Sequence, residues 1–254
     1  MFPKVSVVVP AYNLARYLGR AIDSALAQDW PAEALEVIVV DDGSTDETQQ
    51  VLGAYGERIR VVRQDNGGLV RAVDRGLAEV TGDYVALLDA DDEWPTDRLT
   101  RHVAFLEAHP EVGLVHGDMT IIDAEGAVLS PSFFEANGTH LTRGRVLGRL
   151  LGGNFVSGGA STFRAALLPA VRPIADDAAY PDWWIAATIA AVAVFTGTGL
   201  LPGTSVEAAL WLAETRRKLD ASSGNVCPKS EHSRDNARHL RRIPMVENGF
   251  VVFG

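Results

Sequence analysis

Four acidic residues lie within five positions of one another where an apolar segment of the chain ends. In VALLDADDEW the apolar run stops at Asp89, and Asp91, Asp92 and Glu93 follow directly. Crowded carboxylates repel one another and are costly to keep charged without a positive partner. Asp89 and Asp91 are hard oxygen ligands suited to Mg²⁺ or Mn²⁺, with substrate phosphates and water completing the coordination. The spacing therefore predicts a bound divalent cation whose coordination is completed by a diphosphate.

Two further polar clusters follow other apolar runs. PAYN (Pro10–Asn13) follows VSVVV, and DDGS (Asp41–Ser44) follows EVIVV. If each run is a strand of a parallel sheet, the three clusters face one crevice at the carboxyl ends, where such sheets bind ligands. Asp and Ser after a strand can also be plain helix caps, and Ser44 with Glu47 has the spacing of a capping box. Three convergent clusters favour a ligand site.

The elements that must position these clusters alternate between short β-branched runs and helical patterns. Strands are expected at Val5–Pro10, Glu36–Asp41, Arg58–Val62, Asp83–Asp89, Gly113–Met119 and Ala160–Arg164. Helices are expected at Leu14–Gln28, after DGSTDET, and at Gly67–Val80, Thr96–His109 and Arg143–Leu151, with a hairpin turn at Asp123–Gly126. This alternation predicts an α/β fold with a Rossmann-like, mostly parallel central sheet and helices on both faces.

Composition excludes several classes of protein. The 254-residue chain has a net charge of −10, which argues against nucleic-acid binding because few phosphates would be neutralised. Its single cysteine, Cys227, excludes an internal disulfide framework and fits a reducing compartment. The N-terminal MFPKVSVVVPAYN lacks the features of a signal peptide. We therefore expect a cytoplasmic protein.

One apolar segment, residues 183–201, is about long enough to cross a bilayer. It is rich in Ala, Thr and Gly rather than Leu, Asp182 lies directly at its start, and glycines break its second half. We interpret it as a buried helix followed by a strand rather than as a membrane span.

Taken together, the motifs resemble those of the inverting glycosyltransferases of family 2, which have the GT-A fold. The resemblance is carried by VSVVVPAYN, VVDDGSTDET, DNGGLVRAVDRGLAEVTGDYVALLDADD and WPTDRL, from Val5 to about Asp123. NFVSGGASTFR resembles the acceptor-side segment of that family. The resemblance implies a metal-dependent enzyme that moves a single sugar from a nucleotide-diphosphate sugar to an acceptor hydroxyl, in cell-envelope or polysaccharide synthesis.

Residue roles follow from the same resemblance. Asp182, in YPDWW, would be the catalytic base, and Asp91 together with Asp89 would bind Mn²⁺ or Mg²⁺. Tyr12 would stack on the nucleobase, and Asp42 would accept a hydrogen bond from it. The residues expected at the substrate are Pro10, Ala11, Tyr12, Asn13, Asp41, Asp42, Asn66, Gly68, Asp89, Ala90 and Trp183. UDP is the expected donor nucleotide, with dTDP and GDP as alternatives, and the acceptor would be a glycan or a lipid-linked molecule.

The chain divides into three parts on this interpretation. Residues 1–123 form the donor-binding half, residues 124–215 form the acceptor-side half of the same GT-A domain, and residues 216–254 form a basic, weakly patterned tail. The Lys and Arg residues of the tail offer a peripheral contact to the anionic inner face of a membrane, although a solvated end is the simpler interpretation.

Two departures from the family pattern leave an alternative open. Asp74 stands where the family often has Asn, and Pro181 replaces the acid that usually precedes the base. An Asp before an apolar helix is also a common N-terminal charge, and Trp183 could simply pack in a core. The alternative is therefore a noncatalytic nucleotide-sugar binding protein with a degenerate acceptor site.

Overall fold

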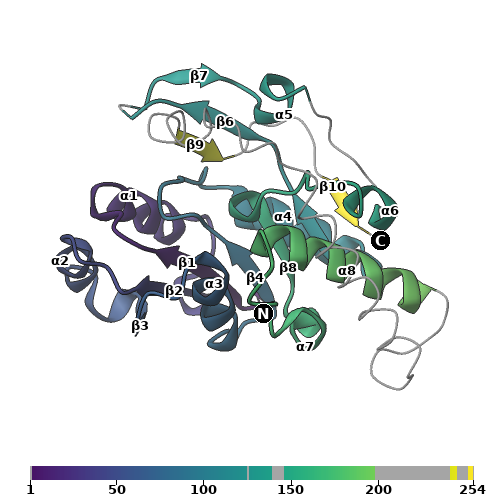
Figure 1. The fold of residues 1–254 in the computed structure, drawn as a ribbon, viewed down its shortest axis with the longest axis horizontal. Helices are drawn as coiled ribbons and strands as arrows, with labels where there is room; N and C mark the ends of the chain where they lie inside the picture. Colours follow the sequence, from purple (N-terminus) through teal and green to yellow (C-terminus); the bar gives the residue numbers. More distant parts are fainter. Residues whose placement is uncertain (1, 125, 139–145, 198–240, 245–250, 254) are drawn as a thin grey trace.

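The computed structural model describes residues 2–124, 126–138, 146–197, 241–244 and 251–253. Its main feature is a seven-stranded sheet in the order β10-β5-β8-β4-β1-β2-β3 (Figure 1). The strands are β1 Val5–Ala11, β2 Leu35–Asp42, β3 Arg60–Gln64, β4 Tyr84–Leu87, β5 Leu114–His116, β8 Ser161–Arg164 and β10 Val251–Phe253. Strands β1 to β4 pair in parallel, and β8 runs antiparallel between β4 and β5. The predicted mostly parallel sheet is confirmed.

A second sheet of three antiparallel strands, in the order β7-β6-β9, lies at the top of the view in Figure 1. Its strands are β6 Met119–Ile122, β7 Val128–Ser130 and β9 Arg241–Pro244. The expected hairpin turn after Asp123 is confirmed, since Asp123 N–H donates to the Ala127 carbonyl at 2.9 Å. The single strand expected at Gly113–Met119 is wrong, because β5 and β6 divide it between the two sheets.

The helices come between the strands as the alternating pattern requires. They are α1 Ala15–Leu26, α2 Thr48–Gly53, α3 Leu69–Ala78, α4 Arg98–Ala108, α5 Phe133–Ala136, α6 Leu147–Leu150, α7 Leu168–Val171 and α8 Pro181–Gly197, with 3₁₀ turns η1 Ala32–Ala34, η2 Gly56–Arg58, η3 Gly158–Ala160 and η4 Ala165–Leu167. The helix expected over Arg143–Leu151 is described from Leu147 onward, because residues 143–145 lie outside the described ranges.

The capping box predicted from Ser44 and Glu47 is wrong. Helix α2 begins at Thr48 and has no side-chain cap from Glu47. The Asp46 carboxylate accepts a hydrogen bond from the Thr48 N–H at 3.0 Å, and the Ser44 hydroxyl instead accepts one from the backbone N–H of Asn13 at 3.0 Å. Serine is a common helix cap, but the hydroxyl of Ser44 is bound by the loop after β1 and does not cap α2.

Helices cover both faces of the sheet, as the sequence predicts. Side chains of β1 alternate, so that Val5, Val7 and Val9 pack with helices α1, α2 and α4, while Val8 packs on the opposite face with α3 and α8. Helix α3 lies so close to the sheet that a Cβ at Gly76 would come within 2.4 Å of Val8. The strand ends are therefore held in a rigid two-faced core.

Helix α8 contains residues 183–197 of the apolar segment 183–201. Its residues Ile185 to Val192 are buried against the sheet, which agrees with the expected buried helix. Within the described part of the chain, no helix combines the length and apolar character of a membrane span. The strand expected after this helix lies outside the described residues.

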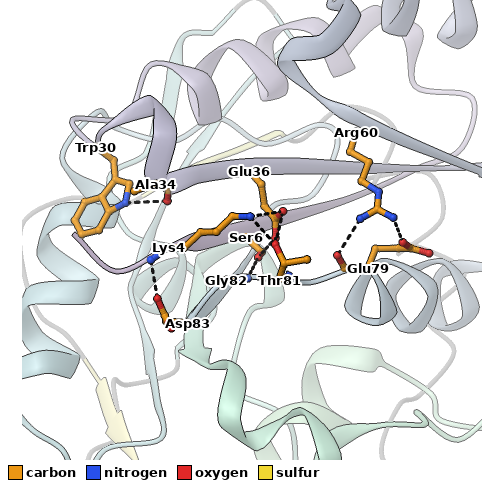
Figure 2. A network of polar contacts seen from close by, with 10 residues as sticks. All are labelled: Lys4, Ser6, Trp30, Ala34, Glu36, Arg60, Glu79, Thr81, Gly82 and Asp83. Carbon is orange, nitrogen blue, oxygen red and sulfur yellow. Dashed lines mark hydrogen bonds and ion pairs between the residues drawn. The ribbon is translucent and has the colours of Figure 1, made fainter. Parts of the chain in front are cut away.

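A network of polar contacts joins the amino ends of the central strands (Figure 2). The Glu36 carboxylate accepts hydrogen bonds from the Ser6 hydroxyl and from the Thr81 N–H, the latter at 2.8 Å. The Lys4 ammonium lies 3.1 Å from the same carboxylate, and the Lys4 N–H donates to Asp83 at 2.8 Å. At this end of the sheet, the carboxylates of Glu36 and Asp83 are bound by groups of the protein itself.

Candidate active site

Asn13 joins the loop after β1 to the loop after β2. Its φ of 53° is in the left-handed region, which Asn tolerates better than other non-glycine residues. Its side-chain Oδ1 accepts a hydrogen bond from the Thr45 N–H at 2.8 Å, and its own N–H donates to the Ser44 hydroxyl. Asn13 thus fixes two of the predicted clusters to each other, while its contact with substrate stays a prediction.

The other residues of the PAYN cluster shape the end of β1. Pro10 has no N–H to donate to a neighbouring strand. On the β4 side of β1 this costs no hydrogen bond, because the pairing between β1 and β4 ends at Val8. Ala11 is buried, whereas the Tyr12 side chain is 47% exposed. Of this cluster, Tyr12 presents the accessible ring that the predicted stacking on a nucleobase requires.

Asp41 and Asp42 are both buried at the end of β2. Asp41 Oδ1 accepts a hydrogen bond from the Ser44 N–H at 2.9 Å. Asp42 accepts hydrogen bonds from the N–H groups of Gly67 and Gly68, both at 2.8 Å. The two carboxylates therefore hold the loops that would surround a nucleotide.

The loop before α3 is exposed and carries two predicted substrate residues. Asn66 is exposed, and Gly68 has a φ of 84°, which favours glycine. A Cβ at Gly43, also at positive φ, would lie 2.8 Å from the Asn66 nitrogen, so this loop packs directly on the DDGS loop. A nucleobase contact by Asp42 or Asn66 stays a prediction.

Arginines provide positive charge for two of the four acids after β4. Glu93 forms an ion pair with Arg20 of α1, with Nε and Oε1 2.6 Å apart. Asp92 is buried, and its charge favours the protonated form of the fully buried Arg98. Burial nevertheless lowers the pKa of the Arg98 guanidinium to about 9. These two acids have a structural explanation that needs no ligand.

Asp89 and Asp91 are half-buried, and no described residue donates a hydrogen bond to the carboxylate of Asp91. The side chain of Ala90, between them, is buried in the core beside β1, which leaves only its backbone for a substrate. A metal-binding role for Asp89 and Asp91 stays a prediction.

A glycine turn, Gly158-Gly159, lies close both to Asp182 and to the acid cluster after β4. A Cβ at Gly159 would lie 3.0 Å from Asp89 Oδ2 and 2.8 Å from Asp92 Oδ2. A Cβ at Gly158 would lie 3.3 Å from the Asp182 Cβ. The structure therefore brings together residues that are about ninety positions apart in the sequence.

The residues at this turn fit a divalent cation whose coordination is completed by substrate. Within the described ranges, no group of three or more His, Cys, Asp and Glu side chains is arranged to hold a metal alone. Mg²⁺ and similar ions usually bind one or two carboxylates and complete their shell with phosphates and water. Glycine at position 159 lets the backbone approach the Asp89 carboxylate closely, because a Cβ there would lie 3.0 Å from Asp89 Oδ2.

Asp182 lies in the first turn of α8, and three donors hold its carboxylate. Oδ1 accepts hydrogen bonds from the Trp183 N–H at 2.7 Å and from the Asn154 side chain at 3.2 Å. Oδ2 accepts one from the Gly158 N–H at 3.3 Å. Pro181 is the first helical residue, where a proline is well tolerated, so its departure from the family pattern has a structural reason.

A pocket of about 440 Å³ opens beside Asp182. Its aromatic lining consists of Phe133, Phe134, Phe155, Tyr180 and Trp183. The sequence analysis identified only Trp183 of these, and Trp183 is largely buried, with its indole N–H donating to the Leu150 carbonyl at 2.7 Å. Tyr180, 51% exposed, and Asn154 were missed. Their signal was that each is the first residue of a motif already singled out, YPDWW for Tyr180 and NFVSGG for Asn154.

Two other conspicuous residues have structural roles. Asp74, the departure from the family pattern, pairs with Arg172, with both oxygens 3.1 Å from guanidinium nitrogens. His116 is fully buried on β5, and burial lowers its pKa to about 3, so that it is neutral at physiological pH. Its ring centroid lies 6.0 Å from that of Phe134 and 6.3 Å from that of Phe155.

Comparison with known proteins identifies the family. The model of the family described as Glycosyl transferase family 2 matches residues 6–168, well over half of the chain. The chain belongs to this family. An uncharacterized glycosyltransferase of Nostoc sp. is 42% identical over 124 residues, covering 47% of this chain and 38% of the relative.

Two relatives of this family 2 chain come from Bacillus subtilis. EpsE, which carries the name of a glycosyltransferase, is 36% identical over 159 residues, covering 58% of this chain and 56% of the relative. TuaG, named as a glycosyltransferase of teichuronic acid biosynthesis, is 41% identical over 108 residues, covering 41% of this chain and 42% of the relative. The matches thus span less than two thirds of the length of these relatives.

Solved structures confirm the GT-A fold class expected for family 2. A mannosyltransferase of Pyrobaculum calidifontis, in complex with GDP-Man and Mn²⁺, has a TM-score of 0.59 and 27% identity, covering 76% of this chain and 53% of that chain. TarS of S. aureus, in complex with UDP-GlcNAc, has a TM-score of 0.53 and 27% identity, covering 65% of this chain and 46% of that chain.

Proposed function

We propose that this family 2 chain transfers a single sugar from a nucleotide-diphosphate sugar to an acceptor hydroxyl, with Asp182 as the general base. The observation that carries the proposal is the glycine turn, which places Asp182 beside Gly158 and the metal-ligand candidate Asp89 beside Gly159. A base and a diphosphate-binding site must lie on opposite sides of the anomeric carbon for a single displacement. The proximity of Asp182 and Asp89 to neighbouring residues of the turn supports such an arrangement.

In this reaction the acceptor oxygen forms a bond to the anomeric carbon while the bond from that carbon to the diphosphate oxygen breaks. The transition state has oxocarbenium character. Asp182 takes the proton of the acceptor hydroxyl, and a general base of this kind typically contributes about 10²–10⁴-fold. One displacement by one base inverts the configuration at the anomeric carbon.

Asp91 and Asp89 would hold Mn²⁺ or Mg²⁺. Such an ion supplies Lewis-acid stabilisation of the charge on a leaving diphosphate. The chemistry of these half-buried carboxylates supports the assignment, as does the presence of GDP-Man and Mn²⁺ in the structure of the Pyrobaculum calidifontis mannosyltransferase. The loops fixed by Asp41, Asp42 and Asn13 would hold the nucleotide.

The donor is a nucleotide sugar, with UDP, dTDP or GDP as its nucleotide. UDP-GlcNAc and GDP-Man in the two structural neighbours support this class. We propose a cell-envelope or polysaccharide glycan, or a lipid-linked precursor of one, as the acceptor, a view supported by the name of TuaG. The proposed location is the cytoplasm, at the inner face of the membrane if the basic tail binds there. Most of that tail lies outside the described residues.

The test is Asp182→Asn in a transfer assay with UDP-, dTDP- and GDP-sugars and Mn²⁺. Transfer should fall by at least 10²-fold while nucleotide affinity changes by less than about twofold, because Asp182 acts on the acceptor. Asp83→Asn is the matched control, since Asp83 lies at the opposite end of the strands and, among the described residues, its carboxylate accepts a hydrogen bond only from the Lys4 N–H. Equal loss of transfer and nucleotide binding in Asp182→Asn would contradict the assignment.

A further inference from the structure

Two buried side chains that follow the acid cluster in the sequence bind the backbone at the glycine turn. Trp94 is 5% exposed, and its indole N–H donates to the Gly159 carbonyl at 3.0 Å. Arg98 is fully buried, and its Nη2 donates to the Ser161 carbonyl at 2.9 Å. The Ser161 hydroxyl donates to the Ser157 carbonyl at 2.6 Å, which closes the segment on itself. The turn segment is thus bound at two carbonyls by residues more than sixty positions away in the sequence.

Arg98 and Trp94 also hold each other. The guanidinium carbon of Arg98 lies 3.8 Å from the centroid of the Trp94 ring, which is a cation–π contact. Within the described ranges, Nε and Nη1 of Arg98 have no hydrogen-bond partner. An apolar side chain of similar volume would fill a core at lower cost than a guanidinium with two unbonded nitrogens. Arg98 is therefore better explained by the groups that it binds than by core packing.

The glycine turn that these side chains bind contacts both the proposed base and a proposed metal ligand. The Gly158 N–H donates to Asp182 Oδ2 at 3.3 Å, and a Cβ at Gly159 would lie 3.0 Å from Asp89 Oδ2. Because the two glycines are adjacent, a shift of the turn changes the position of Asp182 relative to Asp89. A displacement of about 1 Å can cost about 10²-fold in rate when it moves reacting groups out of alignment.

We propose that Trp94 and Arg98 are positioning residues, which hold the glycine turn so that Asp182 and Asp89 keep the separation that transfer requires. Each acts through a backbone carbonyl of the turn segment. Both side chains are buried, so they act through the backbone and not on the substrate. The inference rests on the proposed function, because Asp182 is the proposed base and Asp89 is a proposed metal ligand.

Two substitutions of Trp94 separate its hydrogen bond from the packing of its ring. Trp94→Phe keeps a six-membered ring and removes the donor, whereas Trp94→His keeps an N–H at the corresponding ring position and removes the larger ring. Trp94→His should be the less stable variant, because it leaves the larger cavity. If Trp94 positions the turn, Trp94→Phe should nevertheless be the more impaired variant in both readouts below.

The first readout is hydrogen exchange of the Gly158 amide, measured by NMR on the full chain without nucleotide or metal. Exchange should be about tenfold faster in Trp94→Phe, because the turn loses its donor at Gly159, and within about threefold of wild type in Trp94→His. Trp30→Phe is the matched control, since the Trp30 indole N–H donates to the Ala34 carbonyl at 3.3 Å, near the amino ends of the strands (Figure 2). Exchange of Gly158 should not change in this control.

The second readout separates turnover from donor binding. In the transfer assay with UDP-, dTDP- and GDP-sugars and Mn²⁺, Trp94→Phe should lower kcat about tenfold. Nucleotide affinity should change by less than about twofold, since no atom is added against Asp89. Arg98→Lys keeps a positive charge but loses the planar guanidinium, and it should lower kcat about fivefold. Arg101→Lys on the same helix is its control, because the Arg101 guanidinium forms an ion pair with Asp97, with Nη1 and Oδ2 3.7 Å apart.

Three results would overturn the inference: Gly158 exchange in Trp94→Phe equals that of the wild type, Trp94→His is more impaired than Trp94→Phe, or kcat of Trp94→Phe equals that of the wild type. The failure of the proposed function is distinct, because it would appear as undiminished transfer by Asp182→Asn or as absent nucleotide binding. Exchange of the Gly158 amide is measured independently of both.

Discussion

The acidic residues at the two ends of the central strands have different surroundings. At the amino ends, Glu36 is held by Ser6, Thr81 and Lys4, as Figure 2 shows. At the carboxyl ends, arginines provide positive charge for Asp92 and Glu93, while Asp89 and Asp91 remain half-buried at the end of the strand.

The difference shows how a run of acids can be separated into structural and functional members. An acid whose counter-charge comes from the protein stabilises the fold, and removing either partner leaves a costly buried charge. Asp91, whose carboxylate accepts no hydrogen bond from any described residue, is the acid that this view leaves available to a cation. On this basis Asp92, like Glu36, is a structural acid, although it lies next to Asp91 in the sequence.

The largest expected effect is on stability. The free energies of unfolding of Asp92→Asn and Asp91→Asn should differ, because only Asp92 has a structural role. Asp92→Asn should lower the free energy of unfolding by about 3 kcal/mol, because the fully buried Arg98 loses its nearby negative charge. Asp91→Asn should change it by less than about 0.5 kcal/mol in the absence of metal. Urea denaturation measures both, and equal stabilities of the two variants would remove the distinction.

Glu36→Gln tests the amino end. It should lower the free energy of unfolding by about 2 kcal/mol at pH 7, since the carboxylate loses charged hydrogen bonds from Ser6 and Thr81. Nucleotide affinity should not change. Glu33→Gln is the control, because Glu33 is exposed.

The same contacts give the effect of Glu36 a definite pH dependence. Burial alone would raise the pKa of Glu36, but hydrogen bonds from Ser6 and Thr81 lower it below 4.5. A carboxyl with a depressed folded-state pKa stabilises the protein above its unfolded-state pKa and loses that contribution as the pH falls. The stability difference between wild type and Glu36→Gln should therefore shrink below pH 4.5. A constant difference down to pH 3 would contradict this account.

Gly159→Ala should have the smallest effect of the set. A methyl group there would come within 3.0 Å of Asp89 and 2.8 Å of Asp92, so a carboxylate or the turn must shift. We expect Mn²⁺-dependent nucleotide binding to weaken about tenfold. Gly148→Ala on α6, where a Cβ would meet nothing within 4 Å, is the control. An unchanged affinity in Gly159→Ala would place the metal away from the turn.

The fold of residues 5–108 was predictable because local patterns determine it. The buried strands β1 and β2 are continuous β-branched runs, and the acids that follow them must lie at one edge of a parallel sheet. The capping box was wrong because Ser44 has a competing partner in Asn13, which is 31 residues away. Local spacing cannot reveal that competition.

The structure that follows β5 was less predictable because it depends on contacts between distant segments. Tyr180, Phe155 and Phe133 form one pocket, yet they share no period or motif. Strands β9 and β10, three or four residues long, come from the tail and pair with β6 and β5 across more than one hundred residues of sequence. Short strands of this kind are specified by their partners rather than by their own pattern.

The central claim is that the carboxyl end of the sheet holds a nucleotide through a metal on Asp91. Its most direct test is calorimetric titration of UDP, dTDP and GDP, each with and without Mn²⁺, into the wild type and Asp91→Asn. The account predicts that one nucleotide binds only with Mn²⁺ and that Asp91→Asn abolishes this binding while retaining its fold. Metal-independent binding, or equal binding to Asp91→Asn, would contradict it.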